Sequence, residues 1–194
     1  MSREVARALT VVSASTDWQF EQIVDLQRRN HYLTVPSDVQ AREGFVFTRH
    51  TVALLRRMAS ELPQAIALSD AGVVGYCLSL PLSLQEEQPA LAPMFEQFSR
   101  CTYRGRSLAS IPFMVGGQVC VDRAWRGQGL MGRLYDHTRD AAPPRLELCV
   151  TEVAIRNDVS LRAHLRIGFE TIDEYADARE HWAIVARPMT AEGR

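Results

Sequence analysis

The stretch Gln118–Leu134, which reads QVCVDRAWRGQGLMGRL, constrains the fold of this chain more than any other. It opens on β-branched and apolar residues typical of a strand and ends on apolar residues at helical spacing, so it predicts a strand, a turn and a helix. Gly127 and Gly129 lie in the turn, where glycine permits positive φ and places no Cβ in the way of a ligand. Backbone N–H groups of such a turn and of the helix N-terminus can bind a phosphate group. The same turn can also be a plain connection.

A dinucleotide-binding fold is one alternative for this turn. Gly127, Gly129 and Gly132 spell G-x-G-x-x-G, and the acidic Glu152 follows about twenty residues after Gly132. In that fold, however, the strand runs straight into the first glycine, whereas here Asp122–Arg126 intervene. Only about sixty residues follow the motif, which is too few for the further strand–helix units that such a domain needs. We interpret the match as accidental.

A better match is the GNAT superfamily of acyl-coenzyme A-dependent N-acyltransferases. Arg126–Met131 resembles its R/Q-x-x-G-x-G/A signature, although Met131 stands where glycine or alanine is usual. That departure crowds one backbone position but leaves the N–H donors in place.

A second block lies at the expected distance from the first. Residues 151–157, TEVAIRN, are similar to the family's L-E-V-x-x-x-N strand end. Ser160, His164 and Gly168-Phe169 then fall where the family has a small residue, a tyrosine and Gly-Phe. On these two blocks the resemblance covers residues 9–188.

The resemblance implies an α/β (α+β) fold with a mixed central sheet of about seven strands, two splayed parallel central strands and flanking helices. We expect one domain over residues 1–194, since this length suits a single core. Apolar patterning predicts strands at 9–13, 65–68, 73–80, 119–121, 146–154, 169–175 and 181–186, and helices after Thr16, over 51–62, after Gly129 and from Asn157 to Gly168. Residues 30–50 read as irregular. Residues 81–110 read as an insertion, a lid or substrate loop with a short helix at 94–98.

The resemblance also implies acetyl-CoA as co-substrate and assigns residues to it. The pantetheine arm would lie along the backbone of Val119, Cys120 and Val121. The pyrophosphate would contact Arg126, Gly127, Gln128, Gly129, Leu130 and Met131, and further contacts would come from Asn157 and Ser160. Arg126 would add charge for the phosphates, or would simply be solvated. Asn157 suits a helix N-cap as well as a coenzyme contact.

Two residues are candidates for acid–base catalysis. Glu152 lies in an apolar strand, where partial burial raises the pKa of a carboxyl toward that of a useful base; it would otherwise point to solvent or pair with Arg156. His164 stands where the family has a tyrosine acid that protonates the leaving thiolate; the alternative is a packed helix histidine.

Composition excludes several classes of function. The formal net charge of −1 argues against a nucleic-acid binder, and no apolar run approaches a membrane span. The apolar run that follows Arg3 and Arg7 is too short for a secretory signal. The four cysteines show no metal-ligand or disulfide spacing and suit buried thiols in a reducing cytoplasm. The remaining four histidines are scattered, so we expect no metal. The sequence is compatible with a monomer and with a homodimer.

Two hypotheses follow from these observations. The first is a cytoplasmic N-acetyltransferase in which a primary amine of a small molecule or peptide attacks acetyl-CoA directly in a ternary complex. The second is a non-catalytic acyl-CoA-binding sensor on the same fold. In the first, the acceptor would be framed by residues 30–50, the 81–110 insertion and the closing strands near Tyr175 and Asp177.

Overall fold

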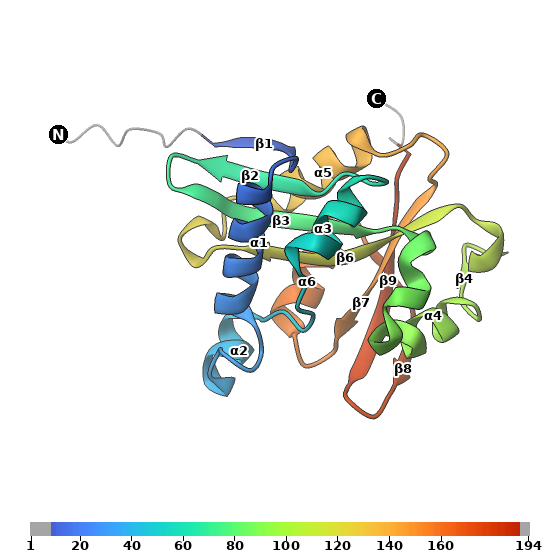
Figure 1. The fold of residues 1–194 in the computed structure, drawn as a ribbon. Coiled ribbons are helices and arrows are strands. Elements are labelled where there is room, and N and C mark those ends of the chain that lie inside the picture. Colours follow the sequence, from blue (N-terminus) through green and yellow to red (C-terminus); the bar gives the residue numbers. More distant parts are fainter. Residues whose placement is uncertain (1–8, 191–194) are drawn as a thin grey trace.

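A mixed seven-stranded sheet forms the centre of the molecule in the computed structural model, which describes residues 9–190 (Figure 1). Its spatial order is β1-β2-β3-β6-β7-β9-β8, and β6 and β7 form the one parallel pair within that described range. The strands are β1 (Thr10–Ser13), β2 (Ala65–Ser69), β3 (Gly72–Leu80), β6 (Phe113–Val121), β7 (Leu148–Ala154), β8 (Glu170–Ala176) and β9 (His181–Pro188). The predicted mixed sheet is therefore confirmed. Arg3 and Arg7 lie outside the described residues.

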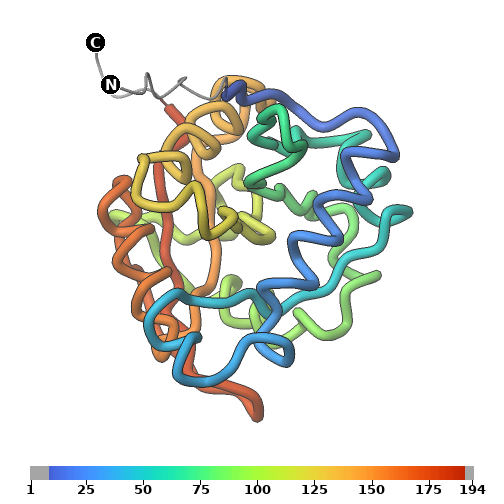
Figure 2. The backbone as a smooth tube through the Cα atoms, turned by 90° about the vertical axis from the view of Figure 1, so that its left-hand side faces the viewer, coloured from blue at the N-terminus to red at the C-terminus, as the bar shows by residue number. Residues whose placement is uncertain are grey.

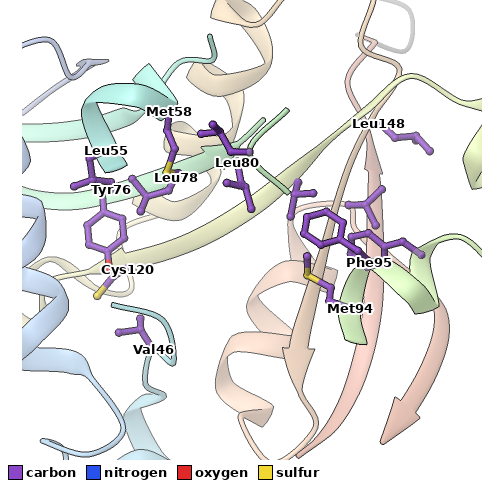
Figure 3. Close-up of a cluster of buried hydrophobic side chains, with 14 of the residues drawn as sticks. Val46, Leu55, Met58, Tyr76, Leu78, Leu80, Met94, Phe95, Cys120 and Leu148 are labelled. Atoms are coloured by element: carbon purple, nitrogen blue, oxygen red, sulfur yellow. The ribbon is translucent and has the colours of Figure 1, made fainter. Parts of the chain in front are cut away.

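Helices cover both faces of the sheet. On one face lie α1 (Asp17–Asn30), α3 (Val52–Ala59) and α4 (Ala92–Phe98), and on the other lie α5 (Leu130–Ala141) and α6 (Asp158–Arg166) (Figures 1 and 2). Each face has its own buried cluster. Figure 3 shows part of the first, which extends from Leu55 on α3 and Tyr76 on β3 to Phe95 on α4. In the described part of the chain no helix combines the length and the apolar character needed to cross a membrane.

Local sequence signals explain where most helices begin and end. Thr16 caps α1 by accepting from the Gln19 N–H, and the Gln19 side chain bonds back to the Thr16 backbone, which completes a capping box. Thr51 caps α3 by accepting from the Leu54 N–H. α3 ends at Ala59 rather than at the predicted Leu62, because the last turn before Pro63 tightens and is no longer α-helical.

Two segments depart from the predictions. Residues 30–50 were expected to be irregular, but they contain α2 (Ser37–Glu43), which contacts α6. Its one buried residue is Gln40, so α2 carries no apolar stripe that periodicity could detect. The insertion holds the expected helix α4, and also a small hairpin of β4 (Thr102–Tyr103) and β5 (Arg106–Ser107) together with short 3₁₀ turns.

β6 and β7 separate after three residue pairs. Only Phe113–Val115 pair with Leu148–Val150, and a hydrogen bond of 2.6 Å from Thr151 Oγ1 to Gly116 O ends their contact. Beyond this point β6 continues with β3 and β7 continues with β9. The β3–β6 register shifts so that Leu78 faces Gln118 while Ser79 faces Gly116, which leaves Gly117 as the extra residue of a bulge. A bulge bends its strand, and this one turns β6 away from β7.

Candidate active site

A cavity of about 460 Å³ occupies the gap beside the outer half of β6. Its walls are β6, the turn after it, the first turn of α5, one side of α6 and the segment 43–48, which we call the strap. Nine of the eleven residues predicted to contact a coenzyme line this first cavity. Of the other two, Gln128 lies outside it, with its side-chain amide 3.5 Å from Ala124 O, and Asn157 lines a neighbouring cavity.

The turn between β6 and α5 is held open by glycine. Gly127 and Gly129 have φ of +74° and +71°, and no atom lies within 4 Å of the place where a Cβ would stand on either. Gly129 immediately precedes α5, whose first N–H groups have no acceptor within the helix. Buried Trp125 and the Asp122 cap of the short 3₁₀ turn Arg123–Trp125 fix the approach to this tip. Backbone N–H groups of a glycine turn and a helix N-terminus can together bind an anion.

The outer edge of β6 offers backbone groups to the first cavity. Asp122 N–H bonds Val74 O on β3, so strand alternation directs the backbone of Cys120 to β3 and the backbone of Val119 and Val121 to the open side. Val121 O already accepts from Arg126 Nε at 2.9 Å. The groups that remain for a ligand on this edge are the N–H and C=O of Val119 and the N–H of Val121.

Arg126 is bound within the protein rather than solvated. Its guanidinium donates to Asn30 Oδ1 at 2.8 Å and to Glu43 O at 3.0 Å, and it forms an ion pair of 3.3 Å with the Glu43 carboxylate. Arg123 pairs with the same carboxylate at 2.9 Å. These bonds tie the turn to the strap and occupy the guanidinium. Arg166, on the last turn of α6, also lines the first cavity, and no ion pair within the described residues engages it.

Asn157 bonds the strap to the start of α6. Its Nδ2 donates to Phe45 O at 2.9 Å, but its side chain makes no capping bond, so the expected N-cap interaction is absent at this position. Its Oδ1 is buried and has no hydrogen-bond partner within residues 9–190. A Cβ added to Gly44, which has φ of +73°, would come within 2.9 Å of this oxygen. An unpaired buried acceptor beside a cavity is a place where a ligand N–H can bind.

A second cavity, of about 100 Å³, lies on the other side of the gap and shares Phe45, Val46, Val119 and Ser160 with the first. Glu152 lines it, from the part of β7 that pairs with β9 but no longer with β6. Burial raises the pKa of the Glu152 carboxyl to about 7, although the Tyr175 hydroxyl donates a hydrogen bond to its Oε2 and Arg179 lies nearby. The carboxyl therefore titrates near neutrality, as expected for a base that acts on an ammonium. The alternative pairing with Arg156 is not formed, since Arg156 bonds Glu180 and Gln40.

His164 lines the second cavity as well, but its ring is fully engaged. Nδ1 lies 2.8 Å from Ser160 O, which can only accept, so Nδ1 carries the proton. Nε2 then accepts from the Tyr135 hydroxyl at 3.0 Å. Burial lowers the pKa of His164 to about 4. At neutral pH this ring is uncharged, and its one N–H is bound to the helix.

Solved structures share this architecture over nearly the whole chain. The ribosomal-protein-S18-alanine N-acetyltransferase of Escherichia coli superposes with a TM-score of 0.60 at 14% identity, over 96% of this chain and 97% of that one. A putative acetyltransferase from Salmonella typhimurium, solved with its cofactor acetyl-CoA, gives 0.58 at 16% identity, over 96% and 97%. NAA60 of Arabidopsis thaliana, in complex with acetyl-CoA, gives 0.61 at 10% identity, over 93% and 99%.

The chain has the GNAT fold. No protein-family model matches its sequence, and a search of curated proteins found no match either. The likeness therefore lies in the GNAT fold itself, including the two splayed parallel strands that the resemblance implied. No group of three or more acidic, histidine or cysteine side chains that could hold a metal occurs within residues 9–190.

Sequence reasoning missed two residues of the candidate site, Glu43 and Arg166. It placed Tyr175 near the acceptor but did not predict its bond to Glu152. Glu43 and Tyr175 contact predicted residues from distant parts of the chain, and no local pattern marks these contacts. Arg166 lies two residues before Gly168-Phe169, so its place at the end of α6 was available as a signal.

Proposed function

We propose that this protein transfers the acetyl group of acetyl-CoA to a primary amine of a small molecule or peptide, by direct attack in a ternary complex. One observation carries the proposal: two adjoining cavities lie at the gap between β6 and β7, the first ending at the helix tip and the second lined by Glu152, whose pKa burial raises to about 7. A primary amine is protonated at neutral pH, so it must lose a proton before it attacks.

The residues that line the first cavity fit acetyl-CoA. The first cavity has the volume of a ligand pocket, and Val119, Leu130 and Met131 give it apolar walls for an extended arm. The helix tip at Gly129 would hold the pyrophosphate, and the unpaired Oδ1 of Asn157 would accept an N–H from an amide of the arm. The amine nitrogen would bond to the carbonyl carbon of the thioester as the C–S bond breaks, and coenzyme A would leave as a thiolate that takes a proton from water.

The protein's own groups would then position and deprotonate the amine. Glu152 would take the proton from the ammonium, and Tyr175 would hold the carboxyl toward the second cavity. We assign His164 a positioning role rather than that of the predicted acid, because its single N–H is committed to Ser160 O. Its bond with Tyr135 holds α5 against α6 beside the gap.

The sensor alternative requires the same cavity but no base. The raised pKa of Glu152 favours the enzyme, since a binding module has no use for a buried carboxyl. Thermal shift with acetyl-CoA and with NAD, followed by a thiol-release assay over an amine library, separates the possibilities. Stabilisation by acetyl-CoA without thiol release in the presence of any amine would support the sensor.

We also propose that the protein works in the cytoplasm. The four buried free cysteines are compatible with this location.

Arg126 is expected to act by position rather than by phosphate contact. Arg126→Met leaves Glu43 O, Asn30 Oδ1 and Val121 O without their donor, so the free energy of unfolding should fall by about 2 kcal/mol. Titration calorimetry should show Kd rising by about fivefold both for acetyl-CoA and for S-acetylpantetheine, which lacks the pyrophosphate. Arg123→Met, which removes one ion pair from the exposed Arg123 side chain to the Glu43 carboxylate, is the control. A loss confined to acetyl-CoA would instead make Arg126 a phosphate ligand.

Arg166 should show the opposite pattern. Its guanidinium lines the first cavity without an ion pair in the described part of the chain, so it is the cation available for a phosphate. Arg166→Gln should weaken acetyl-CoA about threefold to fivefold at low salt, less at high salt, and leave S-acetylpantetheine unchanged. Arg162→Gln, one turn earlier on α6 and paired with Asp158, should change neither Kd. Equal losses for both ligands would refute the assignment.

A further inference from the structure

The second cavity is much smaller than a polypeptide acceptor needs. At about 100 Å³ it falls well below the roughly 300–1,000 Å³ typical of pockets for drug-sized ligands. It lies beside Glu152, where an attacking amine must stand. Its remaining walls come from three places: the strap, the insertion through Leu91 and Met94, and the β8–β9 hairpin through Trp182. Met94 projects from α4 toward the sheet (Figure 3).

Aromatic packing joins two of these walls directly. The ring of Phe47 on the strap lies 5.0 Å from the Trp182 ring on β9, and it also contacts Phe45 at 5.2 Å and Tyr32 at 4.8 Å. Arg156 stacks over Phe45 at 4.3 Å and bonds Glu180 and Gln40. The strap and the hairpin therefore meet at this aromatic contact instead of leaving a groove along which an extended chain could lie.

The strap wall is fixed to the sheet as well. Gln118, on β6, donates from Nε2 to Thr48 O at 3.0 Å. Its Oε1 accepts from Gln27 Nε2 at 2.7 Å and from the Tyr76 hydroxyl at 2.6 Å. A satisfied, largely buried amide network of this kind makes a rigid wall, so the small volume is a property of the fold and not of a loose loop.

Glu152 and Arg179 are the charged side chains that line the second cavity; the rest of its lining is apolar or neutral polar, the latter including Gln118 and Thr151. Phe47, Leu91, Met94 and Trp182 supply the apolar surface. Arg179 is the cation at the rim, and Asp177 neutralises it with contacts of 2.8 and 2.9 Å. No described charge at this cavity is left to pair with a carboxylate or a second ammonium on the acceptor.

We propose that the acceptor is a small primary monoamine with an apolar body, whose ammonium is its only charge. This inference rests on the proposed acetyl transfer and narrows its substrate class. The apolar body would lie against Leu91, Met94 and Trp182, and the nitrogen would face Glu152. An added carboxylate or a second ammonium would lose its hydration without gaining an opposite charge, and a peptide would have to separate Phe47 from Trp182.

The test compares amines at one pH with acetyl-CoA saturating. We expect kcat/KM for butylamine and phenethylamine to exceed that for β-alanine, putrescine and tetra-alanine by at least tenfold. Equal or better turnover of any of those three would overturn the inference while leaving the acetyltransferase proposal intact. If acetyl-CoA neither stabilises the protein nor releases thiol with any of the five amines, both proposals fail.

A variant of the insertion tests the wall itself. Leu91→Ala enlarges the second cavity and should raise the hexylamine-to-butylamine ratio of kcat/KM by about fivefold, since each methylene placed in an apolar pocket favours binding. Leu82→Ala, the same change at an exposed position of the insertion, should leave the ratio unchanged. An unchanged ratio in folded Leu91→Ala would remove the insertion from the acceptor site and overturn this inference.

Discussion

Glu152→Gln should lower kcat by about a hundredfold to a thousandfold, because the amide keeps the shape of the side chain but takes no proton from the ammonium. The Kd for acetyl-CoA should stay unchanged, since Glu152 lines the second cavity and not the first. In the wild type, kcat should rise with pH to a plateau with a midpoint near 7, where the Glu152 carboxyl loses its proton. His164, with a pKa of about 4, should add no second step between pH 5 and 9. Stopped thiol-release assays across this range would measure the profile.

The same variant should be more stable than the wild type at alkaline pH. The folded-state pKa of Glu152 is raised from its ordinary 4.5 to about 7, so the folded protein binds more protons than the unfolded chain between these values. Wild-type stability therefore falls as pH rises from about 4.5 to 7, and Glu152→Gln should remove about 2–3 kcal/mol of this loss at pH 8. Glu174→Gln, an exposed change on β8, is the matched control. The kcat prediction is a separate matter: if Glu152→Gln kept the activity of the wild type, Glu152 could not be the base.

Gly129→Val should raise the Kd for acetyl-CoA by about a hundredfold. At φ of +71° a β-branched residue is strained, so the turn must shift, and the new side chain would fill the open space in front of the helix tip. Titration calorimetry on the folded variant would measure the effect, with circular dichroism to confirm the fold.

Gly105→Val is the control that separates the effect of backbone strain from the loss of coenzyme binding. Gly105, in the β4–β5 turn, has φ of +79° and likewise no atom within 4 Å of its Cβ position, but it lies outside both cavities. Both variants should lose about 1–3 kcal/mol of stability. Only Gly129→Val should lose affinity for acetyl-CoA, and equal affinities in the two variants would refute the assignment of the helix tip.

Local signals in the sequence were enough for most elements of the fold. The glycine turn predicted α5 at its observed start, and the apolar runs predicted all seven strands of the sheet, although β6 begins at Phe113 rather than near Val119. α2 was missed because a seven-residue helix with one buried glutamine has no periodic stripe. The bonds of Arg126 to Asn30 and Glu43 were inaccessible for another reason: their partners are more than eighty residues away in the chain.

The candidate site was located by resemblance more than by residue chemistry. Nine coenzyme-contact predictions fall at one cavity because the motif specifies a local loop geometry. The role of His164 could not be predicted from the motif. Whether a histidine gives up a proton depends on its tautomer and burial, and these are set here by Tyr135 and Ser160 across two helices.

The extra residue at Gly117 has a consequence for how the empty protein behaves. If β6 paired with β7 beyond Thr151, Gly117 would have to join the regular β3–β6 pairing. This one-residue change of register would turn every later side chain of β6 to the opposite face of the sheet. Cys120 would leave the core beside Tyr76, and Val119 would change faces. The separation of the two strands therefore follows from the register of β6, and a ligand can enter between them without breaking any β6–β7 pair.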